Sequence, residues 1–151
     1  MEKPIIWKYS LSPISEEVLR EKEQKLGIQL PEDFRKVFVE NHGGIPFPSC
    51  YYLDGCSMSF GQLLTLMEGE EELEFLEANT DIHREEIGMS ENVIIFATDP
   101  AGNYLCFDYN QLNDGYPAII FWDHEVEGGN AEKICNTFTE LLDMLHDDEE
   151  D

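Results

Sequence analysis

Three titratable residues stand together near the end of a predicted strand, in the segment FWDHEVEGG at residues 121–129. Asp123, His124 and Glu125 could transfer protons, because a histidine among carboxylates can act as a general base. A hydrolase that uses these three residues is one hypothesis. We favour a polar strand end leading into a loop, because neither a nucleophile nor a second set of ligands accompanies them elsewhere in the sequence.

A second stretch, DYNQLNDG at residues 108–115, resembles the start of a calcium-binding EF-hand loop. Asp108 and Asn110 fit the first and third ligand positions. Leu112 stands at the fifth position, and Ile119 stands at the twelfth, where such a loop requires a bidentate glutamate. A hairpin turn explains this stretch better, and we predict neither a metal site nor a cofactor.

The other histidines and the known short motifs add no catalytic signal. His42 precedes a Gly-Gly pair and is expected at the end of a helix, where it would interact with the helix dipole. His83 lies among acidic residues and His146 precedes the acidic tail, so both are expected at the surface. The chain has no GxSxG, P-loop, GxGxxG or HExxH motif. We therefore predict that this protein is not an enzyme.

Length and composition indicate a globular protein of one domain. The chain has 151 residues, of which 42% are hydrophobic and 11% aromatic, enough to form a core. Its longest apolar run, VIIFA at residues 93–97, is far shorter than the about 20 residues that span a bilayer. The N-terminus shows no signal-peptide pattern. We expect a soluble cytoplasmic protein without membrane association.

The four cysteines contain no CxxC pair and give no disulfide framework. Cys106 and Cys135 lie in apolar patterns and are predicted to be buried thiols. Cys50 and Cys56 flank a possible hairpin, and a disulfide between them is the alternative to two free thiols.

Charge is distributed very unevenly along the chain. It contains 9 Lys and Arg residues against 33 Asp and Glu residues, a formal net charge of −24. Residues 1–36 hold seven bases and seven acids, whereas residues 37–151 hold only Arg84 and Lys133 against 26 acids. Such a field repels nucleic acid and anionic membranes and attracts basic partners. We expect no direct binding to nucleic acid, and solubility alone is the alternative explanation of the charge.

The first part of the chain predicts two short helices. Ser15 is a good N-cap for the first helix, which Gly27 would end in a left-handed conformation. Pro31 suits the first position of the second helix, and Gly43-Gly44 ends it. The apolar stripe of this second helix is predicted at Phe34, Val37 and Phe38. Glu23 falls near the apolar face of the first helix, which is unusual for a carboxylate.

The middle of the chain predicts a sheet. We expect strands at residues 51–55, 92–99, 103–110 and 117–125, a helix at residues 70–89, and either a strand or a helix at residues 59–69. An Asp-Gly pair at residues 114–115 predicts the hairpin turn between the last two of these strands.

A last helix is predicted to begin near Asn130, on the stripe of Ile134, Phe138, Leu141, Leu142 and Leu145. Residues 147–151, DDEED, form an acidic tail. The fold class is therefore α+β: an antiparallel twisted sheet flanked by an N-terminal helix pair and a C-terminal helix. One domain is expected over residues 1–151, with its core at about residues 15–145.

The order and spacing of these motifs resemble the SUKH superfamily. The resemblance lies in LGIQLPEDFRKVFVENHGG, IIFATDPAGNYLCFDYN, PAIIFWDHE and FTELLDML. The matching positions are Glu23, Leu26, Gly27, Leu30, Pro31, Phe34, Gly43, Gly44, Gly102, Asn103, Phe107, Asp108, Trp122, Phe138 and Leu142. This chain departs from the family pattern after Gly55, where it has SMSFGQLL in place of a segment that often carries a Trp.

The resemblance implies a twisted sheet flanked by helices and a function in protein binding. Bacterial members of the superfamily are mostly immunity proteins that bind and neutralise a cognate toxin domain, frequently a nuclease. Fungal members act as scaffolds in cell-wall regulation. The expected partner is therefore a basic toxin domain, and a regulatory scaffold that binds cellular proteins is the alternative.

Charge and resemblance together predict an acidic face that docks on the basic groove of a toxin nuclease. Aromatic residues among the acids would anchor such an interface. The candidate partner-binding residues are Tyr51, Tyr52, Asp54, Tyr104, Asp108, Trp122, Asp123, His124 and Glu125. For Trp122 and Tyr104, packing in the core is the alternative to contact with a partner.

Overall fold

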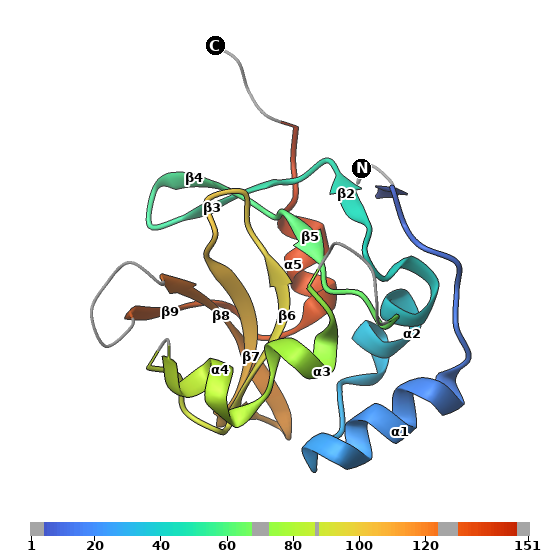
Figure 1. Ribbon diagram of the computed structural model, residues 1–151. Coiled ribbons are helices and arrows are strands. Elements are labelled where there is room, and N and C mark those ends of the chain that lie inside the picture. Colours follow the sequence, from blue (N-terminus) through green and yellow to red (C-terminus); the bar gives the residue numbers. More distant parts are fainter. Residues whose placement is uncertain (1–4, 68–72, 87, 124–129, 148–151) are drawn as a thin grey trace.

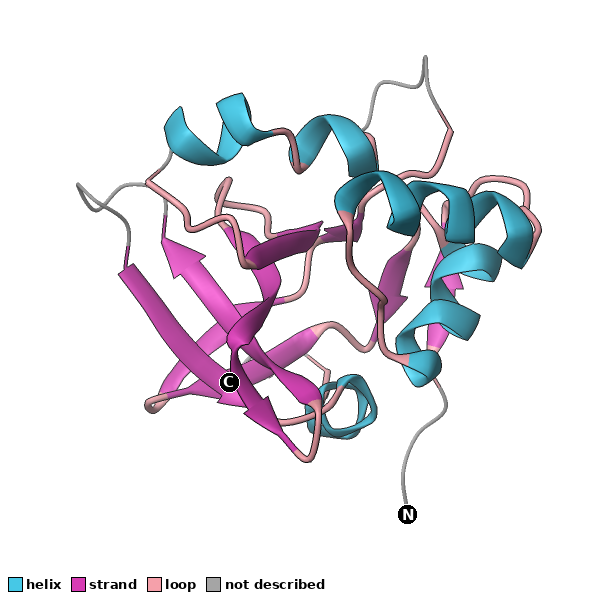
Figure 2. Cartoon of the chain, turned by 90° about the horizontal axis from the view of Figure 1, so that it is seen from below, coloured by secondary structure: helices cyan, strands magenta, loops and turns pink. Residues whose placement is uncertain are grey.

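A twisted antiparallel sheet forms the centre of the molecule (Figure 1). The computed structural model describes residues 5–67, 73–86, 88–123 and 130–147. Within these residues the sheet has five strands in the order β5-β6-β7-β8-β9, and two-stranded ribbons form from β1–β2 and β3–β4. The N-terminal helices α1 and α2 lie on one side of the sheet, and α5 packs against it (Figures 1 and 2). The predicted α+β fold class is confirmed.

The predicted N-terminal helix pair is confirmed. Helix α1 spans Glu16–Leu26, where the Ser15 hydroxyl accepts from the Val18 N–H at 3.3 Å and Gly27 has φ 71°. Helix α2 spans Glu32–Asn41, so Pro31 directly precedes the helix and does not occupy its first position. Phe34 and Phe38 are buried as predicted, whereas Val37 is half-buried.

Two short ribbons flank the helix pair and the sheet. Strand β1 (Ile6–Lys8), which the sequence did not predict, pairs with β2 (Ile45–Phe47). Strand β3 (Cys50–Leu53) confirms the strand predicted at residues 51–55, and it pairs with β4 (Cys56–Ser59). Asp54 and Gly55 join β3 to β4 with φ of 52° and 79°, the left-handed pair of a two-residue hairpin turn.

The three predicted central strands are confirmed as β6 (Val93–Thr98), β7 (Tyr104–Asn113) and β8 (Tyr116–Asp123). Asp114 and Gly115 turn between β7 and β8 with φ of 53° and 82°, as the Asp-Gly signal predicted. The ambiguous segment at residues 59–69 contains β5 (Gln62–Leu63), which pairs with β6. The residue before β5 is Gly61, and only glycine fits there because a Cβ would lie 2.4 Å from the Thr98 carbonyl oxygen.

The single helix predicted at residues 70–89 is wrong. In the described residues this segment forms two short helices, α3 (Phe75–Ala78) and α4 (Asp81–Glu86). Asn79 separates them because its buried side chain hydrogen-bonds to the backbone of strand β6. On α4, Ile82 is 73% exposed, whereas Arg84 is buried.

The start of the C-terminal helix was also predicted wrongly. Residues Asn130–Cys135 form strand β9, which pairs with β8, and helix α5 spans Phe138–Met144. Thr137 is the N-cap: its hydroxyl accepts from the Glu140 N–H, and the Glu140 carboxylate accepts from the Thr137 N–H. Of the predicted stripe, Ile134 therefore lies on β9, whereas Phe138, Leu141 and Leu142 lie on α5.

A cluster of aromatic rings joins the helices to the sheet. The Phe34 ring centroid lies 4.8 Å from those of Phe38 and Phe138 and 5.1 Å from those of Phe96 and Phe107. Each such pair adds about 0.5–1.5 kcal/mol beyond the burial of area. One residue of α2 thus packs against β6, β7 and α5 at once.

The cysteines are all free thiols. Cys50 pairs with Ser59, and Cys56 pairs with Leu53, in the register of the β3–β4 ribbon. The ribbon therefore sets these two cysteines at different rungs of the ladder, and the alternative of a Cys50–Cys56 disulfide is not realised. Cys106 is buried as predicted, and Cys135 is half-buried.

Across the part of the chain that the structure describes, no helix combines the length and the apolar character that a bilayer crossing requires.

Candidate partner-binding surface

The fold removes several of the few basic side chains from the surface. Arg35 is buried and donates to the Glu23 carboxylate at 3.0 Å, and Lys22 donates to Glu74 at 3.2 Å. Arg84 is also buried and contacts Asp81 at 3.1 Å. In the described residues, the exposed Lys and Arg side chains are Lys8, Arg20, Lys25, Lys36 and Lys133. The fold buries the acids Glu23, Glu74, Asp99 and Asp108 as well, so the solvent-facing surface keeps the acidic excess that the sequence indicates.

Exposed acids also lie on the side of the molecule away from the helix pair, and one of them, Asp81, contacts the buried Arg84. In Figure 1, α1 and α2 lie at the right, whereas α4 and β9 lie at the left. The exposed carboxylates of the α3–α4 segment are Glu77, Asp81, Glu85, Glu86 and Glu91. We call these five residues, together with Asp54 and Glu132, the acidic side.

Two carboxylates of the acidic side come from different parts of the chain. Asp54 stands at the tip of the β3–β4 hairpin, and Glu132 lies on β9. A hydrogen bond between their side chains raises the pKa of Glu132. The hairpin tip therefore places its acid directly beside the edge strand of the sheet.

Three of the predicted partner-binding residues are buried. Tyr51 is 0% exposed, and Trp122 and Asp108 are each 7% exposed. Burial raises the pKa of the Tyr51 hydroxyl, as expected for a phenol that is removed from water. For Trp122 the alternative of core packing is the one observed. The side chains of these three residues are therefore packed inside the fold and are not exposed to a partner.

Asp108 also explains the EF-hand-like stretch. Its carboxylate accepts from the Asn110 N–H at 2.9 Å and from the Gln111 amide at 2.8 Å, which shapes a bulge in β7. In the residues that the structure describes, no three His, Cys, Asp or Glu side chains converge as ligands of a metal ion would.

Tyr52, Tyr104 and Asp123 lie at or near the surface. Tyr52 is 50% exposed and stacks on His146 with 4.5 Å between ring centroids. Tyr104 is half-buried and meets the His83 ring edge-on at 6.0 Å, and Asp123 is half-buried at the end of β8. His124 and Glu125 lie outside the described residues. Contact between these residues and a partner stays a prediction.

His42 has a role that sequence reasoning missed. It is 0% exposed, its Nε2 lies 2.8 Å from the Ser12 carbonyl oxygen, and its Nδ1 accepts from the Leu66 N–H at 3.0 Å. The Leu66 contact places the ring proton on Nε2, which then donates to Ser12. His42 therefore connects the end of α2 to the segments that contain Ser12 and Leu66. No periodicity in the sequence carries this information.

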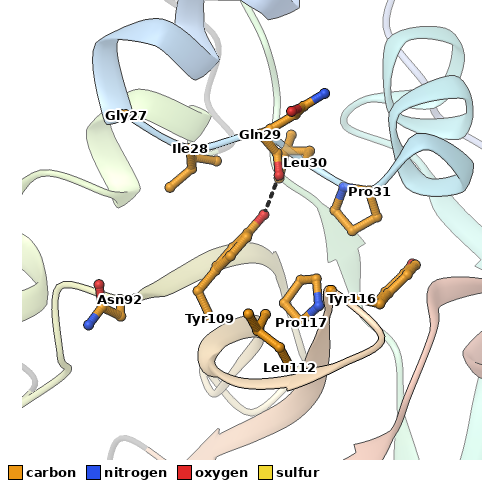
Figure 3. A pocket seen from close by; sticks show the side chains of 11 residues that line it. Gly27, Ile28, Gln29, Leu30, Pro31, Asn92, Tyr109, Leu112, Tyr116 and Pro117 are labelled. Carbon is orange, nitrogen blue, oxygen red and sulfur yellow. Dashed lines mark hydrogen bonds between the residues drawn. The ribbon is translucent and has the colours of Figure 1, made fainter.

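A groove runs between the α1–α2 loop and the β7–β8 hairpin (Figure 3). It has a volume of about 540 Å³ and eleven lining residues. The Tyr109 hydroxyl crosses it to donate to the Gln29 carbonyl oxygen at 2.8 Å. These lining residues are Gly27, Ile28, Gln29, Leu30, Pro31, Asn92, Tyr109, Leu112, Gly115, Tyr116 and Pro117, and none of them is charged.

Buried polar contacts hold both walls of this groove. Glu23, the carboxylate near the apolar face of α1, accepts from the Leu30 N–H at 2.8 Å, and Arg35 donates to the Leu30 carbonyl at 3.2 Å. On the other wall the Tyr116 hydroxyl donates to Asp33 at 2.6 Å and accepts from the Phe138 N–H at 2.8 Å. The unusual position of Glu23 is thus explained by its role in shaping the α1–α2 loop.

Comparison with known proteins gives two matches. The sequence model of the SMI1 / KNR4 family (SUKH-1) matches residues 13–144. The chain is also similar to the SPbeta prophage-derived uncharacterized protein YokK of Bacillus subtilis (strain 168), with 28% identity over 151 residues. That alignment covers 87% of this chain and 74% of the relative.

Proposed function

This chain belongs to the SMI1 / KNR4 family (SUKH-1), and from that premise we propose that it is an immunity protein. In this proposal it binds a cognate toxin domain, a nuclease, through its acidic side and so neutralises the toxin in the cytoplasm. It acts by occupying the toxin and performs no catalysis of its own. Neither nucleic acid nor a membrane is its partner.

The observation that carries this proposal is the separation of charge in the folded molecule. Beyond residue 36 the chain has only Arg84 and Lys133 as bases, and Arg84 is buried against Asp81. A nuclease must hold the phosphate backbone of its substrate in a basic groove. An acidic surface can cover such a groove, and steering by opposite charges raises association rates to about 10⁸–10⁹ M⁻¹s⁻¹ at low salt.

The origin of the relative adds a second line of support. The similar protein of Bacillus subtilis is described as prophage-derived. A toxin gene and its immunity gene that lie on one mobile element are inherited together, and the prophage origin of this relative agrees with one member of such a pair.

Co-expression tests the proposal. The product of the gene next to the one for this chain is expressed in a bacterial host, alone and together with this chain, and survival is scored. We expect growth arrest with the neighbouring product alone and rescue by this chain. A neighbouring product that is toxic and is not neutralised would contradict the proposal.

A regulatory scaffold is the second candidate function, since fungal members of the superfamily act in this way. A scaffold would bind several cellular proteins and would give no protection against the neighbouring product. Affinity purification from the native host separates the two functions, because an immunity protein should recover one basic toxin as its main partner.

A further inference from the structure

We propose that the groove between the α1–α2 loop and the β7–β8 hairpin binds an apolar side chain of a protein partner, next to a Lys or Arg of the same segment. This inference deepens the proposed function, because the partner is the protein that the acidic side attracts. The acids steer the partner toward this chain, and the groove, whose lining residue Asn92 directly follows Glu91 of the acidic side, supplies the specific contact.

The lining of the groove selects an uncharged, apolar occupant. None of its eleven residues is charged, although 28% of the whole chain is charged. A charged side chain that entered this groove would lose water without gaining an opposite charge, which is costly. An apolar or aromatic side chain would instead bury its surface against Ile28, Leu112 and Pro117. Leu112 is 57% exposed and offers apolar area that the fold itself leaves uncovered.

The rim of the groove determines what should flank that occupant. Glu32 directly follows the lining residue Pro31, and Asp114 directly precedes the lining residue Gly115. Both acids are exposed, and they come from the two opposite walls. A Lys or Arg beside the apolar anchor would be attracted by these carboxylates. The expected segment therefore pairs one large apolar residue with one base.

The groove is already formed in the free protein, so binding would not cost the free energy of ordering its walls. Glu23 and Arg35 fix the Leu30 peptide, and Tyr109 ties the α1–α2 loop to β7 across the groove. Tyr116 links the other wall to Asp33 and to the start of α5. Rigid walls of this kind raise affinity because less freedom is lost on binding. The volume of about 540 Å³ falls within the roughly 300–1,000 Å³ of typical ligand sites.

A random 12-residue peptide library, displayed on phage and selected on the full chain, tests this inference. We expect the recovered peptides to share a Phe, Tyr, Trp, Leu or Met next to a Lys or Arg. Their synthetic versions, measured by fluorescence polarisation, should bind Leu112→Asp at least about 10-fold more weakly than the unchanged chain. The control Ile82→Asp changes another exposed apolar residue, on α4, and should leave the affinity unchanged.

A second pair of variants tests the rim. Glu32→Gln with Asp114→Asn should reduce binding of the peptides that carry a base, and replacement of that base by Gln in the peptide should cancel the difference. Circular dichroism confirms that each variant is folded. Because both substitutions lie at exposed positions, this pair keeps the inference testable even if Leu112→Asp fails to fold.

Three results would overturn the inference: no peptide is recovered, the peptides lack the apolar and basic pair, or they bind Leu112→Asp as they bind the unchanged chain. A chain that dimerises by sedimentation equilibrium and becomes monomeric on Leu112→Asp would also overturn it, because the occupant would then be a second copy. Protection in co-expression is scored separately, so failure of the proposed function and failure of the groove are distinguished.

Discussion

Asn79 shows how a single buried polar side chain can decide the local fold. Its amide nitrogen donates to the Phe75 and Ile95 carbonyl oxygens at 2.9 and 3.0 Å, and its carbonyl accepts from the Ile95 N–H at 2.8 Å. The Asn79 side chain therefore bonds both backbone groups of Ile95 in β6, as the backbone of a neighbouring strand would. The contact with Ile95 fixes Asn79 at the end of α3, and the Thr80 hydroxyl accepts from the His83 N–H at 3.1 Å at the start of α4.

Replacement of Asn79 by Ala should destabilise the protein by about 2–3 kcal/mol, because the buried polar groups of Ile95 lose their partner. Urea unfolding followed by circular dichroism measures the change. The matched control is Asn92→Ala, an exposed position, where we expect less than about 0.5 kcal/mol. Equal effects of the two substitutions would show that the contact with β6 does not hold α3 in place.

Buried phenols and thiols make the free energy of unfolding depend on pH in the alkaline range. Burial raises the pKa of Tyr51, Tyr109 and Tyr116, and it raises the pKa of the Cys135 thiol to about 12. Between the ordinary pKa of these groups and the raised values, the folded state binds more protons than the unfolded state. The free energy of unfolding must therefore fall as pH rises.

We expect the urea midpoint to be constant up to about pH 8.5, the ordinary pKa of a thiol, and to decrease steadily above it. In the variant Cys135→Ala this decrease should be shallower, because one of the responsible groups is missing. Urea titrations at half-unit steps of pH measure both slopes. A midpoint that rises between pH 9 and pH 11 would contradict the proposed cause.

At the scale of elements, the predictions from sequence succeeded where local signals and pairing agree. Ser15 and Gly27 delimit α1, and the Asp-Gly turn at residues 114–115 joins β7 to β8, because caps and turns depend on neighbouring residues alone. The predictions failed at β9, where Asn130 suggested the start of a helix but residues 130–135 pair with β8. Long-range pairing of this kind is not visible in the local pattern.

The candidate site, like the fold, could be predicted from the sequence only in part. The charge imbalance could be read from the sequence, because it is a property of composition. The groove could not, because it exists only where Gln29 and Tyr109, 80 residues apart, are joined by a hydrogen bond. Burial of Tyr51 and Trp122 was likewise hidden, since an aromatic residue on a strand suits either a core or an interface.

The capping box of α5 tests the corrected position of this helix. Thr137→Ala should cost about 1 kcal/mol, because the Glu140 N–H loses its acceptor at the start of the helix. Ser15→Ala at α1 should cost a similar amount, and Ser57→Ala on the exposed strand β4 should cost less than about 0.5 kcal/mol. Chemical denaturation of the three variants measures these changes in the free energy of unfolding. A Thr137→Ala value no larger than that of Ser57→Ala would mean that the cap does not support α5.

At the scale of the whole molecule, the protein has two sides with different charge. The helix pair carries the exposed bases Arg20, Lys25 and Lys36 among five exposed acids, whereas α3–α4, the β3–β4 tip and β9 carry the seven acids of the acidic side with Lys133 as the exposed base there among the described residues. Aromatic packing around Phe34 holds the helix pair and the sheet together, so the two sides keep their relative position. Such a molecule should approach a basic partner with its acidic side first.

The most direct test of this claim is the association rate with the neighbouring toxin domain, measured by stopped flow at several salt concentrations. Two variants remove the same charge from opposite sides: Glu85→Gln with Glu86→Gln on α4, and Glu16→Gln with Glu17→Gln on α1, all four residues being exposed. The account predicts that the rate falls with salt and that the α4 pair slows association several-fold more than the α1 pair. A rate that is independent of salt, or equal slowing by both pairs, would contradict it.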